Sequence, residues 1–331
     1  MAVTAKDVAR DLNLSQPTVS RILSGDRHHR TSDATRRRVF EAAQRMGYQR
    51  NAVASSLRRG KTGVIGLHTS HNYDARNDFY GTIMGALQVA CRARHLDLLL
   101  HSARHGSPAE EMFGKLRDGR IDGLILHARL GDPLVGLLSQ ASLPVVAIAD
   151  SLSGIPSVSC DGESGMGQLL ELLWNRGHRD YVFLAPTIAL PSVEQRRAKF
   201  ESELAARGVE ASRRRIIEIE FERAAPALDD LLEGDRKPVV CCWNDSTAYN
   251  LLRACREKGV SVPQRLAVAG FDGFPDDKVP SHRLVTVACP WEEAAARALE
   301  LLIGLIDPVN SDDLPVSDVC LPVSLIDGDT A

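Results

Sequence analysis

Apolar residues recur along most of the chain in one repeated pattern, a short β-branched or aliphatic run followed by a longer stretch with helical spacing. Up to residue 150 the short runs are VIGLHTS, LDLLLHSA, IDGLILHA and LPVVAIAD, with helical stretches between them. The same rhythm restarts after Cys160 and ends with the run LAVAGFDG at 266–273. Strands that alternate with helices form parallel sheets covered on both faces. The pattern therefore predicts two doubly wound lobes.

The first fifty residues have a different pattern, without strand-like runs. Apolar residues at positions 8, 9 and 12 predict a short helix over 5–12, and Thr4 with Asp7 resembles a capping box at its start. Asn13 tolerates a left-handed conformation and can end this helix. Ser15 is a good N-cap for a second helix, which carries Pro17 in its first turn. Two short helices joined in this way indicate a helix-turn-helix.

The second helix has one apolar and one polar face. Val19 and Ile22 face inward by their spacing. The opposite, N-terminal face corresponds to the part of a recognition helix that reaches base edges in the major groove. It carries Gln16, Pro17, Thr18, Ser20 and Arg21.

The charge is divided unevenly between these two regions. Residues 1–61 hold 13 Lys and Arg against 5 Asp and Glu, whereas residues 62–331 hold 27 against 38. Charge alone is equally compatible with a solvated basic face. A basic head with a helix-turn-helix pattern, however, indicates binding to a polyanion such as DNA.

The segment TAKDVARDLNLSQPTVSRIL resembles the N-terminus of LacI-type transcription repressors. TSDATRRRVFEAAQRMGY is similar to the family's third helix, and NAVASSL to its hinge helix. The resemblance implies base readout by Gln16, Pro17 and Arg21, with phosphate contacts or capping by Thr4, Ser15, Thr18, Ser20 and Asn51. It also implies that Ala54 lets two hinge helices touch and that Leu57 is a minor-groove wedge.

Paired hinge helices imply a homodimer, or a tetramer, on a pseudo-palindromic operator.

The loop GDRHHRT between the second and third helices is unusually basic, and we interpret it as a phosphate contact. Its adjacent histidines, His28 and His29, could instead bind a metal, but they lack a second pair of ligands. We therefore expect no metal site and no cofactor.

The lobes resemble the family's effector core, which is related to periplasmic sugar-binding proteins. GHRDYVFL, NDSTA and LAVAGFDG occur in the family's order. The expected fold is an all-α helix-turn-helix head plus an α/β core of two doubly wound parallel-sheet lobes. The expected domains are a head at 1–50, a hinge helix and linker at 51–61 and a core at 62–331. Within the core we expect lobe 1 at about 62–160 and 290–318, and lobe 2 at about 161–289 and 319–331.

Ligands of open α/β sheets bind at the carboxyl ends of the strands, and between two lobes these ends face one cleft. The strand ends and the resemblance together indicate an effector site. Its expected residues are Ser70, Phe79, Tyr80, Arg196, Phe221, Asn244 and Asp272. Asp245 and Asp161 are weaker candidates, since Asp245 could simply cap the following helix. Asp150 follows Ala149, where the family pattern places the acid, so a bulge would be needed to turn it inward.

The effector class stays open at this point. The family's commonest effectors are sugars or sugar derivatives. Cys289 followed by Pro290, where a polar amide is expected, makes the pocket less polyol-like. A nucleobase, a phosphorylated co-repressor and a non-sugar metabolite are the alternatives.

Several other classes of protein are disfavoured. The seven cysteines form no Cys-x-x-Cys pair, and the chain has no phosphate loop, no nucleophile elbow and no complete dinucleotide fingerprint. No apolar run approaches the ~18 residues of a membrane helix. We therefore expect a cytoplasmic transcriptional regulator that is not an enzyme. The alternative is a cytosolic binding protein with a vestigial DNA-binding head.

Overall fold

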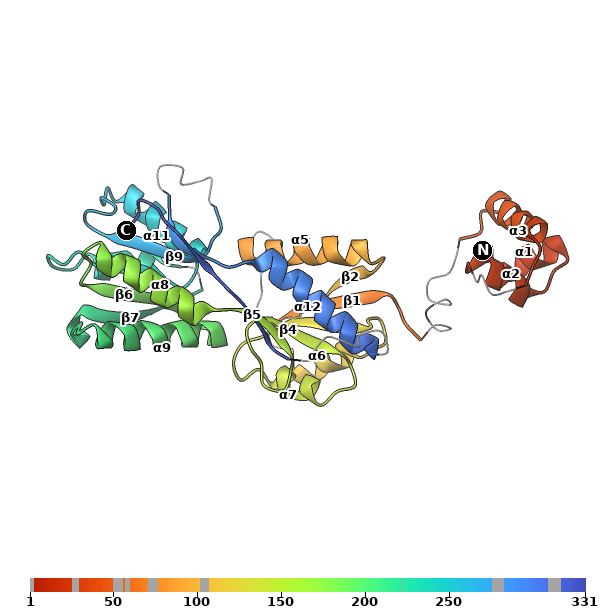
Figure 1. The fold of residues 1–331 in the computed structure, drawn as a ribbon, viewed down its shortest axis with the longest axis horizontal. Helices are drawn as coiled ribbons and strands as arrows, with labels where there is room; N and C mark the ends of the chain where they lie inside the picture. Colours follow the sequence, from red (N-terminus) through yellow and green to blue (C-terminus); the bar gives the residue numbers. More distant parts are fainter. Residues whose placement is uncertain are drawn as a thin grey trace. The chain divides into compact units, whose positions relative to one another are not determined.

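The computed structural model describes residues 3–25, 30–49, 56, 60–70, 77–101, 107–221, 223–275, 283–308 and 317–331. The chain forms two compact units, Met1–Thr62 and Gly63–Ala331 (Figure 1). The first unit contains only helices among its described residues. The second contains two six-stranded sheets with helices on both faces, which confirms the fold class.

The first unit is built from three helices, α1 (Ala5–Leu12), α2 (Gln16–Leu23) and α3 (Asp33–Arg45). Thr4 and Asp7 form the predicted capping box, and Asn13 ends α1 at a φ of 54°. The buried apolar faces of all three helices form one small core, made of Val8, Ala9, Val19, Ile22, Val39, Ala42 and Ala43. An ion pair of 2.5 Å between Arg45 and Asp11 joins α3 to α1 at the surface.

Lobe 1 of the second unit contains a sheet with the strand order β11-β5-β4-β3-β1-β2. Its strands pair in parallel, as expected for a sheet fed by crossover helices. Their bounds are β1 Val64–Thr69, β2 Asp97–His101, β3 Gly123–His127, β4 Val145–Ala149, β5 Ser157–Cys160 and β11 Val319–Leu321.

Helices cover both faces of this sheet (Figure 1). One face packs against α5 (Asp78–Ala93) and α12 (Trp291–Ile306). The other packs against α6 (Ala109–Leu116) and α7 (Pro133–Ser139). The central strands β3 and β4 are buried along their whole length, which explains their unbroken apolar sequences.

Lobe 2 contains a sheet with the order β12-β10-β9-β8-β6-β7. Helices α8 (Gly162–Asn175) and α9 (Pro191–Ala206) cover one face, while α10 (Leu228–Leu231) and α11 (Asp245–Glu257) cover the other. Two short 3₁₀ turns occur at Ala211–Arg213 and Ala225–Ala227. The strands are β6 Tyr181–Pro186, β7 Arg214–Ile219, β8 Val239–Cys242, β9 Ala267–Asp272, β10 Val285–Ala288 and β12 Ser324–Ile326.

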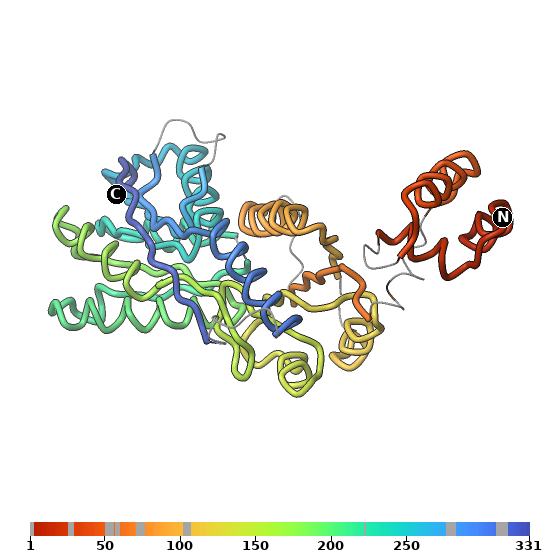
Figure 2. The backbone as a smooth tube through the Cα atoms, turned by 45° about the vertical axis from the view of Figure 1, so that its right-hand side comes forward, coloured from red at the N-terminus to blue at the C-terminus, as the bar shows by residue number. Residues whose placement is uncertain are grey.

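The chain passes between the lobes after β5, after β10 and after β11 (Figure 2). Placing all of 319–331 in lobe 2 was wrong, because β11 pairs in parallel with β5 of lobe 1. Only β12 joins lobe 2, as the antiparallel partner of β10. Pro322 follows β11 directly and has no N–H to donate to a sheet, so the strand ends there and the chain crosses.

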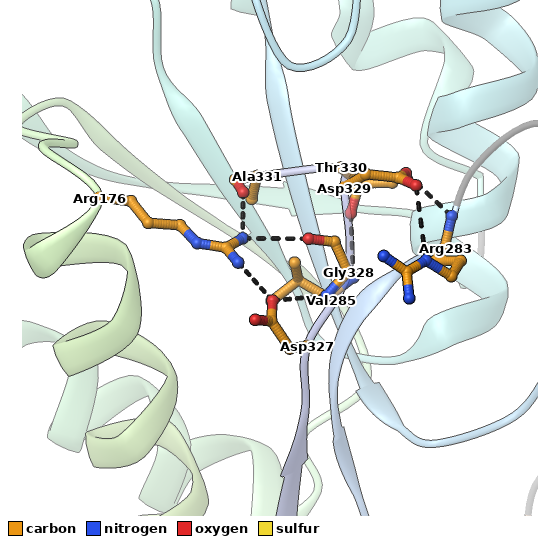
Figure 3. A network of polar contacts seen from close by, with 8 residues as sticks. All are labelled: Arg176, Arg283, Val285, Asp327, Gly328, Asp329, Thr330 and Ala331. Carbon is orange, nitrogen blue, oxygen red and sulfur yellow. Dashed lines mark hydrogen bonds and ion pairs between the residues drawn. The ribbon is translucent and has the colours of Figure 1, made fainter.

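The last residues lie along lobe 2 and are held by a polar network (Figure 3). Arg176 donates to the carbonyls of Gly328 and Ala331 and pairs with Asp327. Thr330 is fully buried, and its hydroxyl accepts a hydrogen bond from the backbone N of Val285. These contacts connect the last residues to the end of α8 and to the start of β10.

Among the residues that the structure describes, no helix combines the length and the apolar character needed to cross a bilayer.

Candidate functional site

The N-terminal unit presents the predicted polar face of α2 at its surface. Gln16, Pro17 and Arg21 are exposed, whereas Val19 and Ile22 are fully buried against α1 and α3. Positions four apart lie on one side of a helix, so Pro17 and Arg21 are neighbours on this face. The helix therefore offers one guanidinium and one amide to a groove while its other side anchors the domain.

The start of α2 is fixed by side chains that the resemblance assigns to phosphate contacts. The Ser15 hydroxyl accepts a hydrogen bond of 3.3 Å from the backbone N of Thr18 and lies 2.8 Å from the Thr18 hydroxyl. Thr4 caps α1 in the same way. Ser20 is partly buried on α2. The helix N-terminus itself is a favourable place for a phosphate.

Three further DNA-binding residues of the sequence analysis, Asn51, Ala54 and Leu57, lie outside the described residues, as do His28 and His29.

The second unit has a cleft between its two lobes, at the carboxyl ends of strands from both sheets. Counting the space open to solvent, the cleft has a volume of about 530 Å³. Its lining combines aromatic walls with a few convergent polar groups, the composition typical of small-molecule sites. The lining residues are Asn77, Phe79, His127, Ala149, Asp150, Cys160, Gly162, Leu190, Ser192, Arg196, Trp243, Asn244, Phe271, Asp272, Cys289 and Trp291.

Among the described lining residues, Arg196 is the only lysine or arginine, and it is 5% exposed. It lies on α9, where Nε donates to the Ser192 carbonyl at 3.0 Å and one terminal nitrogen donates to the Trp243 carbonyl at 2.7 Å. Its guanidinium carbon lies 4.2 Å from the centre of the Phe271 ring. A guanidinium has five donors in a fixed fork. These contacts hold the fork in place at the cleft.

Asp150 is turned into the cleft by the backbone of the preceding residue. Ala149 has a φ of 71°, a left-handed conformation that is uncommon for a residue other than glycine. This reversal at the end of β4 provides the inward turn that the sequence pattern lacked. Asp150 is 1% exposed and lies 2.8 Å from His127 Nε2.

The same carboxylate joins the two lobes. Asp150 Oδ1 accepts a hydrogen bond of 2.7 Å from the backbone N of Ser192. Ser192 lies in the first turn of α9, a helix without a side-chain cap of its own. Burial raises the pKa of the Asp150 carboxyl, but the hydrogen bonds and charge of His127 and the Ser192 donor outweigh it, so the pKa lies below its usual value. The carboxylate therefore caps α9 from across the cleft.

Aromatic rings from both lobes form the walls. In lobe 1, Phe79 meets the Trp291 ring edge-on at 4.9 Å and lies 5.3 Å from His127. In lobe 2, Trp243 and Phe271 occupy the ends of β8 and β9. The indole nitrogens of Trp243 and Trp291 are buried and have no hydrogen-bond partner among the described residues.

Two thiols complete the lining near the crossing strands. Hydrogen bonding with Cys160 and burial raise the pKa of the Cys289 thiol well above its usual value. Cys289 is therefore neutral and weakly polar at physiological pH.

The structure brings four of the seven proposed effector residues together: Phe79, Arg196, Asn244 and Asp272 all line the cleft. Ser70, Tyr80 and Phe221 are not among the lining residues. The Ser70 hydroxyl instead accepts a hydrogen bond from the backbone N of Arg129, and Tyr80 packs against the core of lobe 1. Phe221 stacks behind the cleft, 5.1 Å from the Trp243 ring.

Neither tryptophan was predicted from the sequence, although each lies within three residues of the end of a strand. Trp243 comes after the apolar run PVVCC, and Trp291 comes after the crossing segment that begins at Cys289. Asn77, which caps α5, was also missed because it lies just before the helix that carries Phe79. Asn244, not Asp245, caps α11, and Asp245 is fully buried beneath the cleft.

Comparison with known proteins connects these two sites. The model for "Bacterial regulatory proteins, lacI family" matches residues 4–51, which include all of α1, α2 and α3. The model for "Periplasmic binding protein-like domain" matches residues 170–331. The chain combines the DNA-binding domain of the LacI family of transcriptional regulators with a periplasmic-binding-protein-like core.

Relatives of the LacI family match this chain over nearly its full length. Catabolite control protein A of Priestia megaterium is 28% identical over 330 residues, 97% of both chains. The transcriptional regulator AscG of Escherichia coli K12 is 27% identical and covers 92% of both chains. The transcriptional regulator CelR in complex with cellobiose is 25% identical, has a TM-score of 0.71 and covers 99% of this chain and 100% of its own.

The lac repressor dimer bound to operator and the anti-inducer ONPF has a TM-score of 0.83 to this structure, with 23% identity. It covers 100% of this chain and 99% of its own. At this identity the likeness describes the fold alone.

Proposed function

We propose that the protein is a cytoplasmic repressor whose affinity for a pseudo-palindromic operator depends on a neutral, hydroxyl-rich effector, a sugar or close derivative, bound between the lobes. The proposed role is regulated binding, not catalysis. The observation that carries the proposal is the cleft, where rings from both lobes surround Arg196, Asn244 and Asp272.

The charge of the cleft favours a neutral effector over a phosphorylated one. Two carboxylates, Asp150 and Asp272, line it against one guanidinium, Arg196. Asp150 also already occupies the N-terminal turn of α9, the place where an anion would otherwise be stabilised. An added phosphate would therefore meet no excess of positive charge.

The hydrogen-bonding groups of the cleft suit a sugar. A pyranose ring presents hydroxyl groups at its edge and C–H groups on its faces. The aromatic rings offer flat apolar surfaces to those faces, while Arg196 offers donors to the oxygens. Asp272 is an acceptor for hydroxyl hydrogens. A purine could stack on the same rings and is the second candidate.

On DNA, we assign base readout to Gln16, Pro17 and Arg21 because they are exposed on the polar face of α2. Arg21 can donate to O6 and N7 of one guanine. Thr4, Ser15, Thr18 and Ser20 are assigned to phosphate contacts or caps. The assignments of Asn51, Ala54 and Leu57 to a hinge helix rest on the resemblance alone.

A homodimer would join through α5 and β2 of lobe 1. Strand β2 is an edge strand of its sheet, and an open edge can pair with or pack against another chain. Beside it, Val89 on α5 is 71% exposed and Leu100 on β2 is 43% exposed. Leu100 borders a hollow together with Met84, Leu96 and Leu98, which are half-buried. A second copy would bring two heads to one palindrome.

Coupling between effector and DNA would use the contacts that cross the cleft. Besides the Asp150–Ser192 bond, the backbone N of Leu130 in lobe 1 donates to the carbonyl of Ala189 in lobe 2 at 2.9 Å. An effector that binds between the lobes changes the free energy of this closed arrangement. Coupling energies of this kind are typically about 1–3 kcal/mol.

Titration calorimetry with the full chain tests the proposed effector class. The probes are D-galactose, cellobiose and D-xylulose as sugars, D-galactose 6-phosphate as an anion, and adenine and guanine as purines. We expect at least one neutral sugar to bind and Asp272→Asn to weaken its binding. Asp161→Asn is the control, because Asp161 caps α8 and lies outside the cleft lining. Asparagine can form the same cap, so this variant should bind the sugar as the wild type does. Binding of a purine alone would favour the second candidate, and tighter binding of the phosphate would contradict the charge argument.

A further inference from the structure

The backbone that presents Asp272 to the cleft adopts a conformation that residues other than glycine rarely adopt. Asp272 has a φ of 123° and the following Gly273 a φ of 85°. Conformations of this kind cost free energy and persist only where the surroundings hold them in place. The turn after β9 therefore needs an anchor if Asp272 is to keep its position.

Asp245 supplies that anchor from below. One oxygen of its carboxyl, Oδ2, accepts hydrogen bonds of 2.7 Å from the backbone N of both Gly273 and Phe274. The other, Oδ1, accepts a bond of 2.5 Å from the Thr286 hydroxyl on β10. The two residues that directly follow Asp272 are thus held by one side chain.

The surrounding sequence makes room for this carboxyl. Asp245 is fully buried and does not line the cleft. A Cβ at Gly270 would overlap its Oδ1, so only glycine leaves the space at that point of β9. Tyr249, one turn further along α11, donates its hydroxyl hydrogen to the carbonyl of Phe274 at 3.1 Å. Helix α11 therefore holds the turn at two points.

We propose that Asp245 is a positioning residue of the effector site, acting through Asp272. The inference rests on the proposed function of the cleft, but the anchor itself can be tested without a ligand. The other interpretation is that Asp245 only stabilises lobe 2. Its neighbour Asn244 contacts the cleft directly, whereas Asp245 reaches it only through the turn.

Two substitutions separate these interpretations. Asp245→Ala removes all three acceptor contacts. Asp245→Asn has the same shape, since its amide oxygen can accept from Gly273 and Phe274 while its NH₂ donates to the Thr286 oxygen. Asp318→Ala is the matched control, because Asp318 also accepts from one backbone N and one hydroxyl, both of Ser157 in lobe 1 away from the cleft.

Amide hydrogen exchange of the ligand-free full chain is the first measurement. In Asp245→Ala we expect the Gly273 and Phe274 amides to exchange about tenfold faster or more, with the central strands of both sheets still protected. In Asp245→Asn and Asp318→Ala these two amides should exchange as in the wild type. Unchanged exchange in Asp245→Ala would overturn the anchor.

Binding of the sugar probe that gives the largest heat with the wild type, among D-galactose, cellobiose and D-xylulose, is the second measurement. We expect Asp245→Ala to weaken it about tenfold and Asp245→Asn by no more than about twofold. Asp245→Ala combined with Asp272→Asn should bind no more weakly than Asp272→Asn alone, because both changes act on one contact. Independent losses, or an equal loss in Asp318→Ala, would mean a purely structural role and overturn the proposal.

Thr286→Val covers the case in which Asp245→Ala does not fold. It removes the donor to Oδ1 and leaves the two amide contacts, so we expect smaller changes of amide exchange and of affinity in the same direction. If neither quantity changes, the proposal is contradicted. If no probe sugar binds the wild type, the proposed effector class fails, whereas the exchange measurement still decides whether Asp245 anchors the turn.

Discussion

Replacement of Asp245 by asparagine should make the protein more stable at alkaline pH than at acidic pH, relative to the wild type. Burial raises the pKa of Asp245 to about 7, although Thr286, Phe274 and Gly273 all donate to the carboxyl. In the unfolded chain the same carboxyl has a pKa near its ordinary value of 3.8. Between these two values the folded protein holds a proton that the unfolded chain has lost.

The sign and size of the effect follow from this difference. A raised carboxyl pKa in the folded state means that stability from this group is present at low pH and is lost as pH rises through about 7. Each pKa unit corresponds to about 1.4 kcal/mol, so between pH 5 and pH 8 the wild type should lose about 3 kcal/mol through this group. Asparagine cannot titrate, so Asp245→Asn should lack this loss.

Urea unfolding of both proteins at pH 5, 6, 7 and 8 measures the effect. Other titrating groups are common to both chains and cancel in the difference between their free energies of unfolding. We expect this difference to shift by about 3 kcal/mol in favour of Asp245→Asn as pH rises from 5 to 8. A difference that stays constant with pH, or that shifts the other way, would show that the buried Asp245 is ionised throughout and refute the reasoning.

Three further outcomes follow from the packing and surface of the chain. Arg21→Ala should remove about 1–3 kcal/mol of discrimination between operator and unrelated duplex, measured by competition at fixed salt, and equal discrimination in both proteins would contradict its role. Gly165→Ala should destabilise by about 1–3 kcal/mol in thermal unfolding because its Cβ would lie 2.7 Å from Val287 Cγ1. Gly167→Ala on the same helix, where only the flexible end of Lys199 is near, should not be destabilised. Val89→Glu should give monomers in sedimentation velocity, and an unchanged dimer would exclude the α5 face.

Much of the fold could be predicted from the sequence because its signals are local. The helices of the first unit begin at Thr4, Ser15 and Ser32, each of which caps through its own hydroxyl. The strands of both lobes are short apolar runs between helical stretches. The place of β11 in lobe 1 instead of lobe 2 could not be predicted in this way, because it depends on pairing with β5, a partner about 160 residues away.

The site was predicted in part for the same reason. Arg196, Asn244 and Asp272 lie at positions fixed by local landmarks, and the cleft brings them together. The inward turn of Asp150 depends on the left-handed backbone of Ala149. Alanine does not favour this conformation, so the sequence did not predict the turn. Phe221 lies outside the cleft lining because its ring packs against Trp243, a contact between two separate strand ends.

Selection of random duplex DNA by the purified full chain tests the central claim most directly. The selection is run at one moderate salt concentration, first without metabolite and then with the sugar and purine probes, with Arg21→Ala in parallel. We expect the wild type to recover two inverted half-sites in at least one condition, and Arg21→Ala to lose them. Recovery of no common sequence in any condition would contradict the claim and indicate a binding protein whose head no longer reads DNA.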